Sequence, residues 1–185
     1  MRKNFGAKPY MYPMPVLIIG TYDESGVPDA MNAAWGGICE ADEIMLCLSE
    51  SHKTTQNILK RKAFTVSFAD RAHAVECDYV GVVSANKEPN KFAKAGFTAV
   101  KSEFVDAPLI EQLPMAFECE LKKVNEDGLI IGKIVNVCAD ERILGKDGKP
   151  DLAKFAPICF DAANGTYLAL GDVVGKAFSD GLKIK

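Results

Sequence analysis

The sequence predicts a single domain of mainly β structure, an antiparallel β-barrel with a few short helices. Short apolar or alternating segments bounded by turn residues recur along most of the chain, helical segments are few and brief, and the strands follow one another as meanders. A strict alternation of strands and helices would instead predict a parallel sheet. The 185 residues are 48% hydrophobic and 25% charged, as in one globular domain, and no linker or repeat divides residues 1–185.

Four strands and one helix are predicted in the first part of the chain. The strands are expected at residues 14–22, 29–39, 44–49 and 63–68, with a turn at residues 23–26 and helical turns at residues 56–61. The third strand is almost continuously apolar, which is typical of a strand buried on both faces. The fourth strand alternates, so Phe64, Val66 and Phe68 should share one buried face.

The second part of the chain is predicted to hold short helices and two strand pairs. A helical turn is expected at residues 72–80, and a short helix at residues 88–95 should have Pro89 at its first position and stop at Gly96. The turn Asn125-Glu126-Asp127-Gly128 is the strongest hairpin signal in the sequence. The expected strand pairs are 116–125 with 128–139, and 157–160 with 166–170.

Charge and hydropathy exclude several classes of partner. The net charge is −3 and no block of Lys or Arg is present, which argues against a nucleic-acid or anionic-membrane partner. Near the N-terminus, Pro13 and Pro15 interrupt the apolar run, and residues 16–19 are far too few to span a bilayer. The sequence therefore predicts a cytoplasmic protein without a membrane partner.

The cysteines and the missing motifs narrow the chemistry. Six cysteines are scattered without a C-x-x-C pair, so buried free thiols are expected rather than a metal site or disulfides, although Cys39 and Cys47 flank a candidate ligand loop. Neither a G-x-G-x-x-G turn nor a P-loop is present. With only His52 and His73 in the chain, a hydrolytic triad is not indicated. We therefore expect no metal and no catalytic residues of the chain's own.

One strand-to-helix junction is unusually rich in hydrogen-bond donors. The stretch SESHKTTQNI, residues 49–58, follows an apolar strand and leads into helical turns, with Ser51 or Thr54 as the expected N-cap. A helix N-terminus offers unpaired N–H groups and a partial positive charge, and hydroxyls and Lys53 add to them here. The stretch favours a phosphate site. The alternative is an ordinary capped helix whose polar residues are merely solvated.

A second stretch is suited to a flat ligand. Met31-Asn32-Ala33-Ala34-Trp35-Gly36-Gly37 lies in the middle of the second predicted strand, and its small residues allow a ring to approach the backbone closely. Main-chain groups would then meet the hydrogen-bonding edge of an isoalloxazine. The alternative is close packing or a bulge at a barrel corner, with Trp35 in the core. An anion site without catalytic groups is typical of a protein whose phosphorylated cofactor supplies the chemistry.

Several motifs in a fixed order carry a family resemblance that extends to about residue 140. They are Pro15-Val16-Leu17-Ile18-Ile19-Gly20-Thr21, Gly26-Val27-Pro28-Asp29-Ala30, Asn32-Ala33-Ala34-Trp35, Ser51-His52-Lys53-Thr54 with Asn57-Ile58, and then Asp78, Gly81, Ser84, Lys91-Phe92, Ala107-Pro108-Leu109-Ile110 and Glu118-Cys119. With these motifs the chain resembles the flavin reductase-like FMN-binding split-barrel family, and within it the flavoredoxin subgroup. Residues 167–172 match this family more loosely.

The resemblance implies a homodimeric split barrel that binds FMN without a covalent bond near the subunit interface. The residues implied about the phosphate are Ser49, Ser51, Lys53, Thr54 and Asn57, and those implied beside the ring are Asn32, Ala33, Ala34 and Trp35. His52 is included among the cofactor-binding residues as well. Asp78 and Ser84 either line the substrate side or make ordinary cap and turn hydrogen bonds.

The function implied by the resemblance is that of an FMN-binding oxidoreductase or electron-transfer flavoprotein. Reducing equivalents would pass from NAD(P)H or a protein donor through FMN to free flavin, ferric iron or a redox protein. The alternative is a flavin-binding module or flavin carrier without NAD(P)H turnover.

Overall fold

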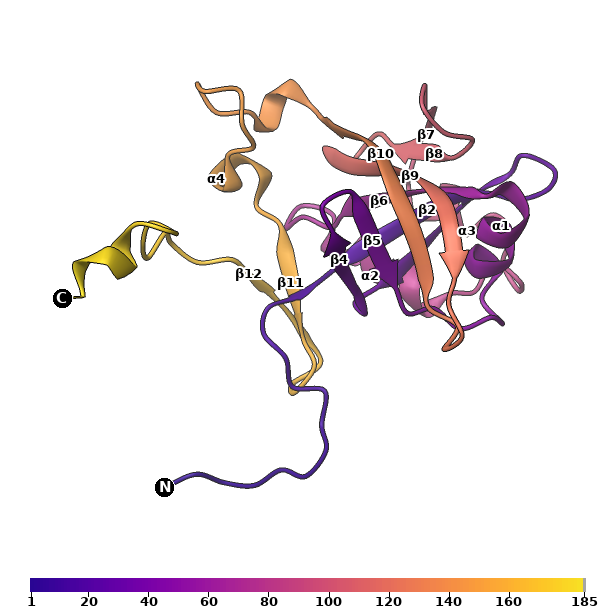
Figure 1. Ribbon diagram of the computed structural model, residues 1–185. Helices are drawn as coiled ribbons and strands as arrows, with labels where there is room; N and C mark the ends of the chain where they lie inside the picture. The colour runs from indigo at the N-terminus through magenta and orange to yellow at the C-terminus, as the bar shows by residue number, and fades with distance from the viewer. Residues whose placement is uncertain (185) are drawn as a thin grey trace.

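The structure, a computed structural model, describes residues 1–184 and is built around one curled antiparallel sheet (Figure 1). The order of its seven strands is β3-β2-β6-β9-β10-β5-β4. Their bounds are β2 Leu17–Tyr22, β3 Pro28–Ala33, β4 Gly36–Glu40, β5 Glu43–Leu46, β6 Ala63–Phe68, β9 Met115–Val124 and β10 Ile130–Ala139. The prediction of a mainly β, antiparallel fold is confirmed.

The sheet curls because its two edge strands are neighbours in sequence. Only Ala34 and Trp35 separate β3 from β4, yet these strands lie at opposite ends of the strand order. A Cβ atom at Gly36 would lie 2.9 Å from Leu17 Cδ1 and 2.8 Å from Leu46 Cδ2, so β4 packs closely against β2 as well as β5. The predicted single strand at residues 29–39 is therefore wrong, because the chain leaves one edge at Ala34 and joins the other edge.

Alternation along the strands separates two hydrophobic clusters. Leu17 and Ile19 of β2 point into the barrel, where they pack with Phe64 and Val66. Ile18 points outward into a second cluster, which includes Val80 and other residues of the helices that cover this face. Phe68 packs against the first cluster, so the predicted shared face of Phe64, Val66 and Phe68 is confirmed.

The helices are short and lie outside the barrel. Their bounds are α1 Lys53–Arg61, α2 Ala74–Val82, α3 Lys91–Lys94 and α4 Leu152–Phe155, with single 3₁₀ turns η1 Glu141–Ile143 and η2 Asp180–Lys183. The helix predicted at residues 56–61 begins three residues earlier. The helix predicted at residues 88–95 is only α3, and Pro89 lies in the turn before it.

Two small sheets complete the fold, and the sequence predicted one of them. β11 Ile158–Asp161 pairs with β12 Thr166–Ala169, as expected, and β1 Met14–Pro15 joins β11. The predicted strand at residues 14–22 is therefore wrong as one strand, because the chain changes sheets at Val16. The pair β7 Ala99–Lys101 and β8 Pro108–Ile110 was not predicted.

The predicted hairpin of β9 and β10 is confirmed. The backbone N–H of Gly128 donates to the carbonyl of Asn125 at 3.0 Å, and Gly128 has a φ of 79°, a conformation that glycine adopts readily. The hairpin lies in the centre of the sheet, where β9 also pairs with β6 and β10 with β5.

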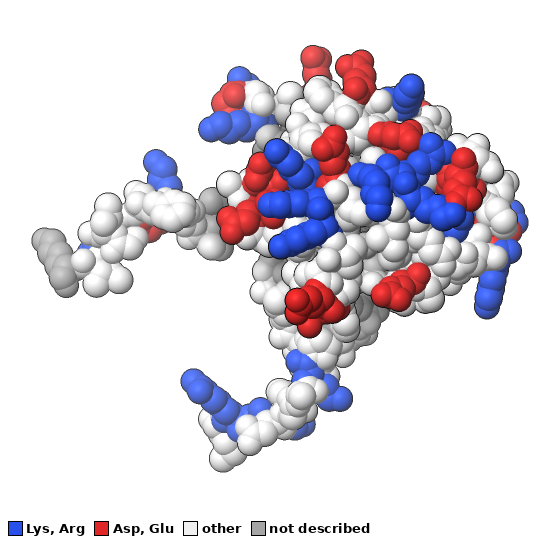
Figure 2. All heavy atoms as spheres, turned by 45° about the vertical axis from the view of Figure 1, so that its right-hand side comes forward, with Lys and Arg blue, Asp and Glu red and all other residues white. Residues whose placement is uncertain are grey.

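Both chain termini extend away from the body of the molecule (Figure 1). Figure 2 shows acidic and basic side chains interspersed over the face of the body that it presents, without a field of one sign. Within residues 1–184, none of the helices combines the length and the apolar character needed to span a bilayer. No group of three or more His, Cys, Asp and Glu residues in this range is arranged to hold a metal ion.

The cysteines divide by position. All six are free, and Cys77, Cys119 and Cys159 are buried, as expected from their apolar strands and helix. Burial raises the pKa of both Cys77 and Cys119 to about 12, so neither thiol is reactive near neutral pH. Cys39 and Cys47 are exposed, which contradicts the expectation of burial for these two.

Candidate functional site

The start of α1 leaves its backbone donors free. His52 is the N-cap residue, and its side chain makes no capping hydrogen bond, so the prediction of Ser51 or Thr54 as N-cap is wrong. Among the described residues, the N–H groups of Lys53, Thr54 and Thr55 have no acceptor, and the first turn carries no acidic side chain. Three unpaired N–H groups and the positive end of the helix dipole can therefore bind an anion.

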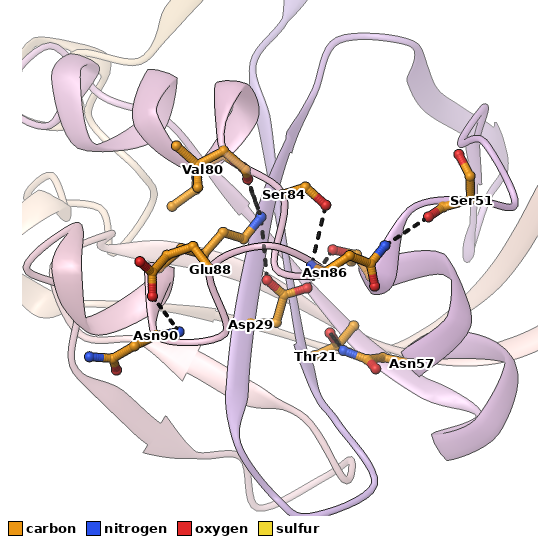
Figure 3. Close-up of polar contacts among 12 residues, drawn as sticks. Thr21, Asp29, Ser51, Asn57, Val80, Ser84, Asn86, Glu88 and Asn90 are labelled. Atoms are coloured by element: carbon orange, nitrogen blue, oxygen red, sulfur yellow. Dashed lines mark hydrogen bonds and ion pairs between the residues drawn. The ribbon is translucent and has the colours of Figure 1, made fainter.

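Polar side chains surround these free N–H groups. The hydroxyls of Ser49 and Ser51 lie 2.8 Å apart, and the carbonyl of Ser51 accepts a hydrogen bond from Asn86 Nδ2 at 3.1 Å (Figure 3). Lys53 is partly exposed and forms no ion pair within residues 1–184. The Nδ1 atom of His52 is buried without a hydrogen-bond partner in that range. An unpaired buried imidazole nitrogen beside a helix N-terminus is a natural contact for a phosphate oxygen.

Two of the predicted phosphate residues, Thr54 and Asn57, attach α1 to the sheet through their side chains. Thr54 Oγ1 donates to Asp29 Oδ2 at 2.6 Å, and Asn57 Nδ2 donates to Thr21 Oγ1 at 3.0 Å. Both residues are buried, at 1% and 2% exposure, and the single hydroxyl proton of Thr54 is donated to Asp29. The backbone N–H of Thr54 is thus one of the free donors at the start of α1, whereas its hydroxyl and the Asn57 side chain hold the helix against β3 and β2.

Asp29 and Lys91 form a buried pair below this loop. Lys91 Nζ lies 3.4 Å from Asp29 Oδ1 and donates to the carbonyls of Val80 at 3.1 Å and Val83 at 3.0 Å (Figure 3). Burial lowers the pKa of Lys91, and the nearby Asp29 partly opposes this shift. The pair ties β3 and α3 to the C-terminal end of α2. Sequence analysis had given Asp29 and Lys91 no role beyond the resemblance, because charged side chains are usually solvated.

Three cavities that share lining residues lie along the loop and the second predicted stretch. The first has a volume of about 230 Å³ and is lined by His52, Lys53, Thr54, Ser84 and Lys91, with Asn32 and Gly81 at its end. The second, of about 330 Å³, shares Asn32 and Gly81 and reaches Ala34. The third, of about 370 Å³, shares Ala34 and includes Trp35 and Cys47. We call this series of cavities the hollow.

The four predicted ring residues differ in what they present to the hollow. Asn32 lines the first two cavities, and its amide donates to the Cys77 carbonyl at 3.0 Å. Ala33 points into the barrel core and is not among the residues that line the three cavities. Ala34 and Trp35 form the corner after β3, and the Trp35 side chain is 56% exposed, so it does not fill the core. Since β3 is an edge strand, one side of its backbone has no strand partner.

A tyrosine from the C-terminal sheet closes the middle of the hollow. The Tyr167 hydroxyl donates to Asp78 Oδ1 at 2.7 Å and accepts from Asn32 Nδ2 at 3.3 Å. Burial, and then the hydrogen bond to Asp78, raise the pKa of Tyr167 to about 12. Sequence analysis did not predict this contact, because the partners are 89 residues apart. Ser84 accepts from the N–H of Asn86 at 3.3 Å, an ordinary turn hydrogen bond, while also lining the first cavity.

Close packing explains one glycine that the resemblance included. A Cβ atom at Gly81 would lie 2.9 Å from Asn32 Cβ, so a larger residue in α2 would displace Asn32 from the junction of the first two cavities. Gly81 is itself exposed and lines both cavities. Glycine at this position therefore lets α2 approach β3 and keeps the hollow continuous.

The sequence and the fold of this chain are similar to those of known proteins. The flavin reductase like domain matches residues 10–155. The flavoredoxin of Desulfovibrio vulgaris (Miyazaki F) is 40% identical, with 98% of this chain and 100% of that chain covered and a TM-score of 0.94. A flavoredoxin from Methanosarcina acetivorans is 24% identical, with 98% and 97% covered and a TM-score of 0.88, and therefore supports the fold alone.

A third neighbour and a sequence relative extend the comparison. An FMN-binding domain of a flavin reductase-like enzyme from Shewanella baltica OS155 is 18% identical, with 88% of each chain covered and a TM-score of 0.78, and it supports the split-barrel fold. An uncharacterized protein of Aquifex aeolicus is 26% identical over 156 residues, 79% of each chain. The chain belongs to the flavin reductase-like family and, within it, to the flavoredoxin subgroup.

Proposed function

We propose that this protein is an FMN-binding oxidoreductase that passes reducing equivalents from NAD(P)H or a protein donor to free flavin, ferric iron or a redox protein. Family membership supports an FMN-related electron-transfer role. The observation that carries the proposal is the hollow, because it joins an anion site at the start of α1 to a corner of small residues and Trp35. FMN requires both features, a site for its phosphate and a surface for its flat ring.

The residues at the two ends of the hollow fit FMN. At one end the N–H groups of Lys53, Thr54 and Thr55 lack acceptors, and the buried Nδ1 of His52 lacks a partner among the described residues. A dianionic phosphate would satisfy these donors, with Ser49, Ser51 and Lys53 beside it. This cluster has the size of one phosphate group, which favours FMN over FAD. At the other end, Asn32, Ala34 and Trp35 would lie beside the ring.

When bound, the flavin supplies the hydride and electron chemistry, so the chain needs no acid or base of its own. The task of the residues is to bind and to orient. Thr54 and Asn57 hold α1 in place through Asp29 and Thr21, so that the free N–H groups face the hollow. Tyr167 keeps its proton and fixes Asp78 and Asn32 beside the middle of the hollow.

The homodimer and the cytoplasmic location remain part of the proposal. Large apolar side chains on both terminal segments are exposed in a single chain, among them Tyr12 at 53% and Phe178 at 104%, which favours an oligomer. Light scattering that gave the mass of one chain, 20.0 kDa, at micromolar concentration would contradict the homodimer.

The anion site is tested by comparing two lysines of the same helix. Lys53→Ala should weaken FMN binding roughly tenfold to a hundredfold, since a charge-assisted hydrogen bond contributes about 1.5–3 kcal/mol, and should affect riboflavin much less. Lys60→Ala removes the same charge from the last turn of α1, where Lys60 pairs with Glu24, and should change neither affinity. Flavin fluorescence titrations measure the dissociation constants of FMN and of riboflavin for each of the two variants. Equal weakening of FMN and riboflavin by Lys53→Ala would refute the phosphate assignment.

The redox role is tested separately with the flavin-loaded protein. Anaerobic addition of NADH or NADPH should bleach the flavin absorbance, and subsequent addition of free flavin or ferric iron should restore it. A loaded protein that neither nucleotide reduces would need a protein donor. If chemically reduced protein also passed no electrons to flavin, iron or a redox protein, the alternative of a flavin-binding module without turnover would hold.

A further inference from the structure

The last segment of the chain, residues 171–184, is locally ordered but does not pack on the body of its own chain. We call it the C-terminal arm (Figure 1, yellow). The N–H of Lys176 donates to Asp180 Oδ2 at 2.8 Å, and the N–H of Asp180 donates to the carbonyl of Lys176 at 3.0 Å. The N–H of Ile184 donates to the carbonyl of Gly181 at 3.3 Å. These hydrogen bonds fold the arm upon itself, around the turn η2.

The C-terminal arm presents apolar side chains to solvent. Its five large apolar residues have exposures between 83% and 104%, and they are Val173, Val174, Phe178, Leu182 and Ile184. Scattered exposed apolar residues are ordinary, but here every large apolar side chain of one segment is uncovered. Two acidic and two basic residues balance the charge of the arm, and Lys183 pairs with Asp180 at 2.7 Å. The arm therefore carries no net charge.

A matching cavity lies where the arm begins. It has a volume of about 380 Å³, and its lining consists of apolar residues and one cysteine, including Met14, Phe68, Leu152, Phe155 and Leu170. We call it the apolar cavity. A cavity of about 150 Å³ suffices for one benzene ring, so this one has room for several side chains. Leu170 lines this cavity and directly precedes the arm, which extends away from the body of the molecule (Figure 1).

We propose that the C-terminal arm of a second copy of this chain docks in the apolar cavity, and that each copy both donates and receives an arm. The exposed arm and the apolar cavity are complementary in chemistry and belong to the same chain, so a second copy supplies the matching surface without another partner. A reciprocal exchange about a twofold axis satisfies both copies and closes the assembly as a dimer.

The exchange would also connect the dimer to the hollow. β11 and β12 contribute Phe160 and Tyr167 to the second cavity of the hollow. β11 also borders the apolar cavity through Ile158 and Cys159, and Leu170, which directly follows β12, lines it as well. An arm docked on this sheet would therefore fix the wall that carries Tyr167. The inference rests on the proposed homodimer but not on FMN binding.

The experiment places the photo-crosslinker p-benzoylphenylalanine at position 178 of the full-length chain. Normal and ¹⁵N-labelled proteins are mixed, unfolded and refolded together, irradiated and digested, and the linked peptides are identified by mass spectrometry. We expect peptides of one isotope joined to residues 13–16 or 150–159 of the other isotope. Crosslinks only within one isotope, or between isotopes but outside these segments, would overturn the inference. Crosslinks between isotopes but outside these segments would still be consistent with a homodimer. A monomeric wild type would contradict both the homodimer and the exchange of arms.

A pair of matched substitutions provides the second measurement. Val174→Asp should raise the dimer dissociation constant at least about tenfold, because it buries a charge in an apolar contact. Val75→Asp makes the same change in α2, at a side chain 79% exposed against 102% for Val174, and should leave the constant unchanged. Sedimentation velocity over a concentration series measures the dimer dissociation constant of each variant. Equal constants for the two variants would overturn the inference, and a circular dichroism spectrum confirms that each variant is folded.

Discussion

The two ends of the hollow are built in different ways. At the α1 end, the free N–H groups rest on a buried polar network in which Asp29 holds Thr54 and Lys91. At the Trp35 end, the shape comes from the path of the backbone and from glycines, and the large side chain is exposed. The first end is held by polar contacts between elements, of Thr54 and Lys91 with Asp29 and of Asn57 with Thr21. The second end depends on close packing of the edges of the sheet. Different kinds of substitution should therefore destabilise the two ends.

Breaking the buried pair should produce the largest loss of stability. Asp29→Ala removes the carboxylate from Lys91, whose side chain is 4% exposed, and the acceptor from Thr54. Removing one partner of a buried pair costs about 3–5 kcal/mol, since an uncompensated charge remains. Urea unfolding of the flavin-free protein measures the free energy of unfolding.

A double variant separates the charge from the packing. Asp29→Asn with Lys91→Met removes both charges and nearly preserves the volumes, so it should cost less than Asp29→Ala alone. If Asp29→Ala lowered the free energy of unfolding by under about 1 kcal/mol, the α1 end would not depend on the pair, and the comparison of the two ends would fail.

Two adjacent glycines test the Trp35 end. A Cβ atom at Gly36 would lie within 2.8 to 2.9 Å of Leu46, Leu17 and the carbonyl of Met45, whereas a Cβ atom at Gly37 would meet nothing within 4 Å. Gly36→Ala should therefore cost about 1–3 kcal/mol through overpacking, and Gly37→Ala should stay within about 0.5 kcal/mol of wild type. Thermal and urea unfolding compare the two variants. Similar losses for both would mean that the edges are not closely packed.

The smallest effect is expected at Tyr167, in the middle of the hollow. Its pKa is raised from 10.0 to about 12, so its contribution to stability is fully present below pH 10 and is lost as the pH rises through 12. Tyr167→Phe removes the hydrogen bonds with Asp78 and Asn32 and should cost about 0.5–1.5 kcal/mol at neutral pH.

The same substitution gives a titration signature. The tyrosinate absorbance of the wild type should show one group that ionises near pH 12, and this group should be missing in Tyr167→Phe. The difference in unfolding free energy between the two proteins should shrink across that range. A Tyr167 that ionised near pH 10 would show that the middle of the hollow is open to water.

Local sequence was sufficient for the elements whose interactions are local. The hairpin around Asn125 and Gly128 was predicted because the turn residues and the flanking alternation agree. The break at Ala34 was not predicted, because residues 29–39 form an acceptable single strand, and only packing of Gly36 against Leu17 separates β3 from β4. Alternation and turn residues report which side chains are buried, but not which strand lies beside them.

The same distinction applies to the candidate site. The anion site predicted in the stretch 49–58 rests on a local feature, the start of a helix, and that helix start is present with His52 as its N-cap and with the side chains of Thr54 and Asn57 buried. The roles of Asp29 and Lys91 were missed because their contact joins residues far apart in sequence, and so was the contact between Asp78 and Tyr167. The resemblance included three of these four positions without indicating what holds them together.

The two-residue link at Ala34 and Trp35 also bears on the solubility of a sheet this large. An open seven-stranded sheet has two edge strands with unpaired backbone groups, and each edge can recruit a strand from another molecule. Here the link draws the two edges together, α2 and α3 pack against β3, and Gly36 brings β4 onto β2. A variant that lengthened this link would separate the edges and leave two strands available for intermolecular pairing. The corner that shapes the hollow thus also protects the protein from aggregation.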